Sequence, residues 1–247
     1  MTLVLAHRGA NRLEPENTLA AFRRALELGA DGVELDVHST ADARLVVRHD
    51  PVLPGAGRLA ELTAAEIRAV DPLVPALAEA LDVCRGRTVN VEIKSIGPGP
   101  APGSGPVTAD LVVELLTGRR GDVVLVSSFD LTAIDRVRAL DERIPTALLT
   151  ARTTDLGRTL ELAHDRGHRA LNPRAHALAG RRAARLAERA VELGMALYAW
   201  TVNDARQVRR LAAAGVSGII TDVPDRARRA LGGAGDQGTS SVNTSGS

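Results

Sequence analysis

The sequence predicts an α/β fold of the (β/α)8 TIM-barrel type, formed by a single domain. The chain has 247 residues, 45% of them hydrophobic and 25% charged, which suits one large domain with a full core. Eight short apolar or β-branched runs alternate with helical stretches, the pattern of a parallel sheet covered by helices. The first run is followed by HRGAN, whose single glycine differs from the Gly-rich phosphate loop of a doubly wound open sheet. The barrel is therefore favoured over the open sheet.

The expected strands are short runs spread evenly along the chain. In order they are 2–6, 33–38, 89–94, 123–127, 146–149, 169–172, 196–201 and 218–221. An extra extended piece, RLVVRHD at 44–50, lies between the second and third strands and begins a short, abbreviated insertion. Eight β/α units in about 230 residues match the usual size of a TIM barrel.

Cap residues mark the helices between these strands. Asn17 and Thr18 are suitable caps for the first helix, and Gly29 is a suitable stop. Thr63 and Glu66 form the capping-box pattern at the start of a helix in the insertion. The helical stretches are thus delimited by the sequence itself.

Two segments are rich in glycine, one inside the domain and one at its carboxyl-terminal end. The stretch 95–106, SIGPGPAPGSGP, is expected to be a loop because of its proline and glycine content. It follows the third strand directly, so a mobile flap over the site is one hypothesis for it. Residues 232–247 are rich in Gly, Ser and Thr and are expected to form a disordered tail. The barrel domain is therefore placed at 1–231.

Composition excludes several classes of function. Lys and Arg number 31 against 30 Asp and Glu, and the aromatic residues are two Phe, one Trp and one Tyr. Neither a basic surface nor a base-stacking platform is indicated, so no nucleic-acid partner is expected. Cys84 is the only cysteine, which precludes an intrachain disulfide. No signal peptide and no apolar run of about 18 residues is found, so a cytoplasmic protein without stable membrane insertion is expected. The oligomeric state stays open.

A TIM barrel places its functional groups at the carboxyl ends of its strands. Polar residues do gather at these expected ends, from several different strands. The candidates for the site are His7, Arg8, Glu34, Asp36, His49, Glu92, Lys94 and Trp200. This convergence is a stronger indication of a site than any one motif.

Three of these candidates are carboxylates on inward positions of two strands. Glu34 and Asp36 are two residues apart, so they share one face of their strand, and Glu92 lies at the end of the next. Burial and mutual repulsion would raise their pKa values unless a positive charge is present. Ca²⁺ or Mg²⁺, which prefer carboxylate oxygens, would supply it. The alternative is a structural ion-pair network with Arg8 and Lys94.

Two histidines come to the same place from different loops. An unperturbed imidazole titrates at about 6.5, so the pair His7 and His49 suits proton transfer near neutral pH. Arg8 and Lys94 add fixed positive charge that suits an anion such as phosphate. The four other histidines are interpreted as surface or packed residues: His38, His164, His168 and His176. His38 is the nearest of these to the site.

These residues lie in motifs that resemble the glycerophosphodiester phosphodiesterases. The stretch 7–51 contains the pattern of that family: HRG, PENT, GAD with a spaced Glu and Asp, and HD. Later blocks follow in the same order: VEIK (91–94), SSFD (127–130), LNP (171–173), AWTVND (199–204) and GVSGIITDVPD (215–225). The resemblance covers nearly the whole chain up to the tail.

The resemblance implies a (β/α)8 barrel that hydrolyses small glycerophosphodiesters to glycerol 3-phosphate and an alcohol, using Ca²⁺ or Mg²⁺. By position in the motifs, it implies metal ligands at Glu34, Asp36 and Glu92, an acid–base pair at His7 and His49, and phosphate contacts at Arg8 and Lys94. It further suggests attack by a glycerol hydroxyl and a cyclic phosphate that water then opens. Trp200 and Phe129 either line the substrate end or pack in the core.

Two other functions stay open. One is a lysophospholipase D-type or sphingomyelinase D-like phosphodiesterase, which shares a similar arrangement of histidines and carboxylates. The other is a barrel that binds a phosphorylated ligand without turning it over. The insertion after His49, PVLPGAGRLAEL, is shorter than is usual in the family, so the preferred head group is left undetermined.

Overall fold

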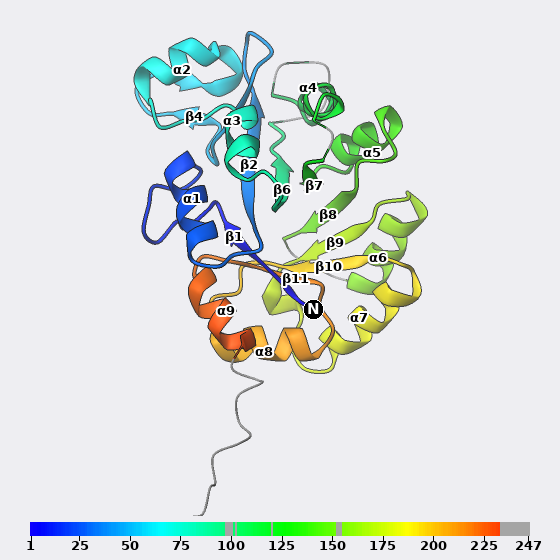
Figure 1. The fold of residues 1–247 in the computed structure, drawn as a ribbon. Coiled ribbons are helices and arrows are strands. Elements are labelled where there is room, and N and C mark those ends of the chain that lie inside the picture. Colours follow the sequence, from blue (N-terminus) through cyan, green and yellow to red (C-terminus); the bar gives the residue numbers. More distant parts are fainter. Residues whose placement is uncertain (97–100, 102, 120, 152–154, 233–247) are drawn as a thin grey trace, which may run out of the picture.

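Eight parallel strands close into a barrel, and helices surround it (Figure 1). The structure is a computed structural model that describes residues 1–96, 101, 103–119, 121–151 and 155–232. The barrel strands are β1 (Leu3–His7), β2 (Gly32–Ser39), β6 (Thr88–Ile93), β7 (Val123–Ser128), β8 (Thr146–Thr150), β9 (Ala170–Pro173), β10 (Ala196–Ala199) and β11 (Gly218–Thr221). The expected fold and all eight expected strands are confirmed.

The first strand closes the barrel. β1 pairs in parallel with β11 on one side and with β2 on the other, and the remaining strands pair in chain order. An α-helix follows each barrel strand in the chain, as Figure 1 shows. These helices are α1 (Leu19–Glu27), α3 (Leu77–Val83), α4 (Gly105–Thr117), α5 (Leu131–Leu140), α6 (Leu156–Asp165), α7 (Arg182–Glu192), α8 (Ala205–Ala213) and α9 (Pro224–Gly232). The short 3-10 turn η2 (Ala175–Ala177) precedes α7.

The insertion between β2 and α3 is small and has its own core. It comprises β3 (Leu45–Val47), β4 (Val52–Leu53), β5 (Gly57–Arg58), the 3-10 turn η1 (Leu59–Glu61) and α2 (Ala64–Val70). β3 pairs antiparallel with β2 and so extends that strand beyond the barrel. Val46, Leu59 and Ile67 are buried together beneath it. The expected capping box of Thr63 and Glu66 starts α2.

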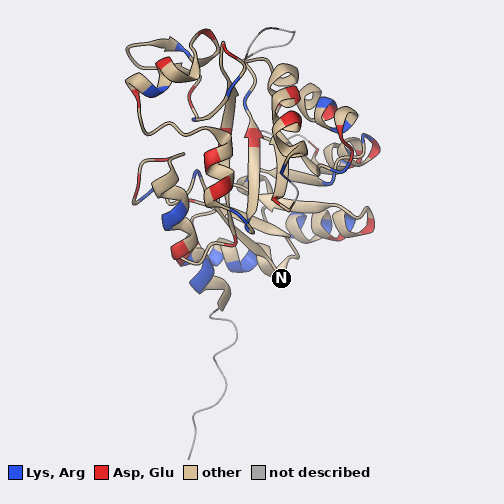
Figure 2. Ribbon diagram, turned by 45° about the horizontal axis from the view of Figure 1, so that its top comes forward, with Lys and Arg blue, Asp and Glu red and all other residues tan. Residues whose placement is uncertain are grey.

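Alternation along the strands separates the outer core from the barrel interior. On β2, Val33, Leu35 and Val37 belong to the apolar cluster that includes residues of α1 and α3. The residues between them, Glu34 and Asp36, are the two acidic residues of the strand. Within the eight barrel strands, Glu34, Asp36 and Glu92 are the only Asp, Glu, Lys or Arg residues. Positive and negative residues are otherwise interspersed on the outer helices and loops (Figure 2).

The amino-terminal half of the barrel interior is filled by small and apolar side chains. We call this cluster the apolar floor: Leu125, Ala147 and Ala170, with Ala196 and Tyr198 packed against them. Gly218 is needed beside Tyr198, because a Cβ atom at this glycine would lie 2.3 Å from the ring carbon Cδ1 of the tyrosine. The floor closes the barrel below the polar groups and makes it a packed core, as is usual for this fold.

Some local expectations need correction. Thr18 caps α1 through its side chain, whereas Asn17 has a left-handed φ of 59° and contacts Asp36 instead. The expected loop at 95–106 ends at Ser104, because α4 begins at Gly105 with a proline in its first turn, where a missing N–H costs nothing. Residues 97–100, 102 and 233–247, with the flap and most of the tail, lie outside the described residues. Among the residues described, no helix has the length and apolarity to span a membrane.

Candidate active site

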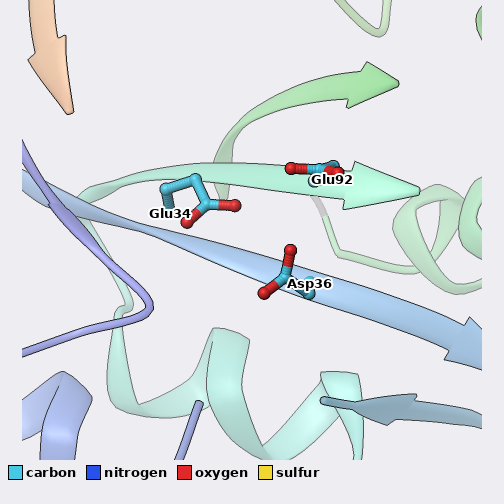
Figure 3. A group of neighbouring side chains, drawn as sticks. All are labelled: Glu34, Asp36 and Glu92. Carbon is cyan, nitrogen blue, oxygen red and sulfur yellow. The ribbon is translucent and has the colours of Figure 1, made fainter. Parts of the chain in front are cut away.

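Three carboxylates meet at the carboxyl-terminal half of the barrel interior, and we call them the carboxylate cluster: Glu34, Asp36 and Glu92. β2 and β6 are paired with Asp36 opposite Glu92, which brings the side chains together (Figure 3). One oxygen from each side chain lies within 4.8 Å of the others. All three residues are buried, at 3%, 1% and 8% exposure. Strand register and period-two alternation therefore build the cluster.

The three carboxyl groups have different pKa values because their surroundings differ. Burial, with the charge of Asp36 added, raises the pKa of Glu34 to about 8. Burial and Asp36 also raise the pKa of Glu92. Burial would raise the pKa of Asp36 too, but the positive charges of Lys94 and Arg8 outweigh it, and that pKa is lowered. Asp36 is therefore ionised at neutral pH.

Two cationic side chains contact the cluster. Lys94 Nζ lies 2.9 Å from Asp36 Oδ1 and 2.5 Å from Glu92 Oε1. Arg8 Nε lies 3.2 Å from Asp36 Oδ2, and its Nη1 lies 3.0 Å from Glu16 Oε2. The ion-pair network considered from the sequence is thus present. It centres on Asp36 and includes Glu92, while Glu34 pairs with neither cation.

The cluster is also suited to a metal ion. Glu34 Oε1 is buried and accepts no hydrogen bond, and Asp36 Oδ1 accepts no well-aligned one although Lys94 is near. A buried carboxylate oxygen without a donor is costly unless a cation approaches it. The possible ligands are all oxygens, which is the donor set that hard divalent cations prefer. The residues present therefore fit a divalent metal.

His7 lies beside the cluster at the end of β1. Its Nε2 atom is 3.9 Å from Glu34 Oε2, and its Nδ1 atom is 2.7 Å from Asp222 Oδ1. Burial alone would lower the pKa of His7, but the hydrogen bond with Asp222 and the charge of Glu34 outweigh burial and raise it. One ring nitrogen is therefore engaged by Asp222, and the other is directed toward the cluster.

His49 approaches the same cavity from the segment that follows β3. Its Nδ1 atom lies 2.8 Å from Asp50 Oδ1, and both side chains are exposed, at 37% and 69%. The backbone carbonyl of His49 lies 3.1 Å from Nε2 of the buried His38. His38 therefore packs beneath this segment, which agrees with its interpretation from the sequence as a packed residue.

An aromatic wall faces the carboxylate side of the site. Trp200, just after β10, donates its Nε1–H to the carbonyl oxygen of Asn172 at 2.8 Å. Phe129 packs edge-on against the indole with ring centroids 5.6 Å apart, and the Arg174 guanidinium lies 5.6 Å from the indole centroid. These contacts hold the indole at the rim, where Trp200 and Phe129 both line the site cavity.

The structure brings the predicted site residues together. Seven of them line one cavity of about 160 Å³: His7, Arg8, Glu34, His49, Glu92, Lys94 and Trp200. Asp36 lies next to it, in contact with Lys94. A larger cavity of about 740 Å³ lies outside the barrel, where Leu45, Arg68 and Leu115 are among its lining residues. None of the predicted site residues lines that outer cavity.

Three polar residues contact the site or line its cavity although they are not among the eight candidates from the sequence; of these, Asp222 was expected at the mouth of the barrel, and Asn17 as a cap or a residue behind the site. Asn17 donates Nδ2–H to Asp36 Oδ2 at 2.8 Å. Asn90 lines the cavity, is buried, and has no hydrogen-bond partner for either side-chain polar atom. Asp222 binds His7 from the other end of the chain. Asn90 was detectable, since it precedes Glu92 by two residues and shares its face, whereas no spacing links Asp222 to His7.

Comparison with known proteins gives consistent matches over most of the chain. Residues 7–226 match the Glycerophosphoryl diester phosphodiesterase family. A glycerophosphodiester phosphodiesterase from Caldanaerobacter subterraneus subsp. tengcongensis is 34% identical over 244 residues, which cover 91% of this chain and 95% of that protein. The crystal structure of a glycerophosphodiester phosphodiesterase from Thermotoga maritima matches with a TM-score of 0.77 and 27% identity, covering 91% of this chain and 96% of that one.

A further solved structure is similar in fold. An Oleispira antarctica phosphodiesterase, in complex with the product sn-glycerol-3-phosphate, superimposes with a TM-score of 0.79 and 24% identity. The match covers 94% of this chain and 97% of that chain. At 24% identity this similarity shows the fold alone.

Proposed function

Since this chain belongs to the glycerophosphoryl diester phosphodiesterase family, we propose that it hydrolyses glycerophosphodiesters by metal-dependent acid–base catalysis with two histidines. The chain is a phosphoric diester hydrolase, and the expected products are glycerol 3-phosphate and an alcohol. The observation that carries the detailed proposal is the carboxylate cluster with His7 beside it. Three buried acidic groups next to a histidine suit phosphate chemistry better than they suit a structural core.

The carboxylate cluster is the proposed site of a Ca²⁺ or Mg²⁺ ion. The ligands would be oxygens of Glu34, Asp36 and Glu92. A bound divalent cation neutralises charge on the phosphate oxygens and polarises the phosphorus centre. Asn17 keeps Asp36 oriented, because its amide donates to Asp36 Oδ2 and accepts from the Asp36 backbone N–H. Such support around a ligand is worth about 10–100-fold in metal affinity or activity.

His7 and His49 are the proposed proton carriers. One takes the proton of the substrate's glycerol hydroxyl as that oxygen attacks phosphorus, and the other protonates the departing alkoxide. Water then opens the cyclic phosphate with the two roles exchanged. The two side chains reach the same cavity from β1 and from the segment after β3. An acid–base pair requires one histidine on each side of the phosphodiester, and the approach of His7 and His49 from two different elements supports this proposal.

Lys94 and Arg8 are the proposed phosphate contacts. Lys94 has three N–H donors and contacts two carboxylates, and Arg8 has five donors and contacts Asp36 and Glu16. Each therefore keeps a donor for a phosphate oxygen while it stays ion-paired. Donors fixed in this way offset developing negative charge without reorganising, which is commonly the largest contribution to catalysis.

The size of the cavity bears on the substrate. Its volume of about 160 Å³ is below the roughly 300–1,000 Å³ of pockets that enclose drug-sized ligands. A neighbouring cavity of about 460 Å³ shares Glu92, Lys94 and Phe129 with it. A small glycerophosphodiester suits the site cavity, with its head group extending past Phe129 toward this neighbouring space. The alternative, a phosphodiesterase for acyl-bearing lipids, requires an apolar surface for the chain, and we rank it second.

A substrate panel tests the proposal. Purified protein is incubated with glycerophosphodiesters of different head groups and with lysophosphatidylcholine, in the presence of Ca²⁺, Mg²⁺ or EDTA. We expect glycerol 3-phosphate to form only with a metal. His7→Ala and His49→Ala should each lower kcat about 10²- to 10⁴-fold.

The matched control for the histidine variants is His164→Ala, because His164 is 44% exposed on α6 and, among the described residues, pairs with Asp165 alone. Its activity should equal that of the unmodified protein. Full activity after exhaustive EDTA treatment would contradict the metal assignment. Cleavage of lysophosphatidylcholine without cleavage of any glycerophosphodiester would favour the lipid alternative.

A further inference from the structure

The imidazole of His7 lies between carboxylates of the two neighbouring strands. In the barrel β1 has β11 on one side and β2 on the other, with Ala6 opposite Thr221 and His7 opposite Glu34. Nδ1 is 2.7 Å from Asp222 Oδ1, just after β11, whereas Nε2 is 3.9 Å from Glu34 Oε2. The closure of the barrel therefore gives each ring nitrogen a different acidic neighbour.

Asp222 is itself held by donors alone. Asn11 Nδ2 lies 2.8 Å from Oδ1, while Asn203 Nδ2 and Arg12 Nη2 lie 2.7 and 3.1 Å from Oδ2. The Asp222 backbone N–H donates to Asn203 Oδ1 at 2.9 Å. Burial would raise the pKa of Asp222, but the hydrogen bonds from His7, Asn11 and Asn203 outweigh it, and the pKa lies far below its usual range. Asp222 is thus an acceptor only.

An acceptor opposite Nδ1 determines where the histidine carries its hydrogen. A neutral imidazole has one N–H and one lone pair, and the bond made by one nitrogen sets the state of the other. Nδ1 must donate to Asp222, so Nε2 is the atom that faces the site with its lone pair. The same bond fixes the plane of the ring, since the carboxylate is anchored through both of its oxygens.

His49 has no equivalent support. Its neighbour in the chain, Asp50, is 69% exposed and contacts Nδ1 from the same segment. Among the residues described, the side chain of Asp50 has no partner but His49. An exposed ion pair of this kind restrains a side chain only weakly. Of the two histidines, His7 is therefore the one whose carboxylate partner is itself held in place.

We propose that Asp222 is a positioning residue for His7, which holds the hydrogen on Nδ1 and presents Nε2 to the phosphodiester. This inference rests on the proposed function, because it concerns how one member of the acid–base pair is oriented. Asn203 and Asn11 act one step further out by holding Asp222. The role is distinct from metal binding, since Asp222 lies on the side of the imidazole away from Glu34.

The principal test is Asp222→Asn, measured by kinetics and by NMR. The NH2 of the new amide replaces one of the two carboxylate oxygens, each of which accepts two donors: Oδ1 from His7 and Asn11, and Oδ2 from Asn203 and Arg12. The NH2 is expected opposite His7, because Nδ1 becomes an acceptor when the imidazole changes tautomer, whereas the Arg12 guanidinium has no acceptor. The substitution should therefore invert the His7 tautomer. We expect kcat to fall about 10²- to 10⁴-fold with KM nearly unchanged, as for the carboxylate that orients a catalytic histidine in serine proteases. ¹⁵N spectra of histidine-labelled protein should show the His7 hydrogen on Nδ1 before the substitution and on Nε2 after it. The His7 signals are those absent from His7→Ala.

Two further variants separate positioning from a structural role. Asp222→Glu keeps the carboxylate, so it should retain the Nδ1–H tautomer and recover part of kcat, whereas a merely structural role would make the longer side chain at least as harmful. Asn203→Ala should lower kcat about tenfold by loosening Asp222. Asp225→Asn is the matched control, because Asp225 lies three residues further on and pairs with Arg229. Its kinetics should be unchanged.

Several results would overturn the inference. A kcat within about threefold of normal for Asp222→Asn would do so, as would a large loss of kcat with the His7 tautomer unchanged. If Asp222→Asn does not fold, the other two variants test the inference. A normal kcat for Asn203→Ala, together with no recovery of kcat in Asp222→Glu, would contradict a positioning role for Asp222. The tautomer is measured without turnover. Absence of hydrolysis by the unmodified protein would therefore reject the proposed function, while an unchanged tautomer rejects the role of Asp222.

Discussion

The two halves of the barrel interior differ in what they contain, although the same strands build both. Toward the amino-terminal ends, Leu125 and Tyr198 belong to the apolar floor, where small and apolar side chains fill the space. Toward the carboxyl ends lies the carboxylate cluster, where Glu34 Oε1 is buried and accepts no hydrogen bond. The floor has no charge to solvate, whereas the cluster holds three acidic groups within 4.8 Å.

This difference separates stability from function along the axis of the barrel. Burial of apolar area stabilises the floor by about 25 cal/mol per Å². In the cluster, buried like charges destabilise the native state, as the raised pKa values of Glu34 and Glu92 indicate. One half of the interior therefore stabilises the fold, while the other, the proposed metal site, lowers its stability when no cation is bound. Substitutions in the two halves should then have opposite effects on stability and on activity.

Of the changes that compare the two halves of the interior, Glu34→Gln has the largest expected effect. It removes a proposed metal ligand and should lower kcat/KM about 10²- to 10³-fold at saturating metal. It also removes a buried charge, so the melting temperature in EDTA at pH 8 should rise. Enzyme assays and calorimetry measure the two outcomes. Glu27→Gln on α1 is the matched control, since Glu27 is 63% exposed, and it should change neither quantity.

A substitution in the floor should do the reverse. Leu125→Ala removes a buried side chain, and we expect the free energy of unfolding to fall by about 2–5 kcal/mol. The kcat of the folded fraction should be unchanged, because no floor residue lines the site cavity. Urea denaturation and assays normalised to folded protein test this. A fall in kcat at full folding would mean that the two halves are coupled.

The smallest expected effect is a pH dependence confined to the cluster. The pKa of Glu34 is raised from 4.5 to about 8, so between these values the native state binds more protons than the unfolded state. This contribution to stability is fully present below pH 4.5 and is lost as the pH rises through about 8. In EDTA the melting temperature should therefore decline from pH 5 to pH 8, by about 2–4 °C for each kcal/mol lost.

Two controls belong to the pH experiment. Glu34→Gln should make the decline shallower, because one of the groups with a raised pKa is gone while Glu92 and His7 remain. Leu125→Ala should lower the whole curve without changing its slope. An equal slope in Glu34→Gln and in the unmodified protein would place the titration elsewhere than at this carboxyl group.

Most of the fold followed from the sequence because each barrel strand is a separate apolar run. Alternation on β2 was sufficient to place Glu34 and Asp36 inside the barrel. In a closed parallel barrel β2 pairs with β1 and β6, so His7 and Glu92 at the ends of those strands lie beside Glu34 and Asp36. The start of α4 at Gly105 was missed, since a Gly/Pro-rich stretch resembles a loop even where proline occupies the first turn of a helix.

The contacts that each site residue makes were harder to predict from the sequence. Alternation along a strand determines the face on which a side chain lies, but not which neighbour it bonds. The contact of Lys94 with Asp36 depends on the reach of the lysine from β6 across to β2. The hydrogen bond of His7 with Asp222 joins residues that are 215 positions apart, and only the pairing of β1 with β11 brings them together.

The pairing of the first strand with the last also has a consequence for biosynthesis. A ribosome that has made β1 to β10 has supplied the carboxylate cluster and both histidines, but β1 still lacks its neighbour on one side. His7 acquires Asp222 only after residue 222 leaves the exit tunnel. In a nascent chain the proposed acid–base pair therefore lacks the contact that positions His7 until the last strand of the barrel has been made.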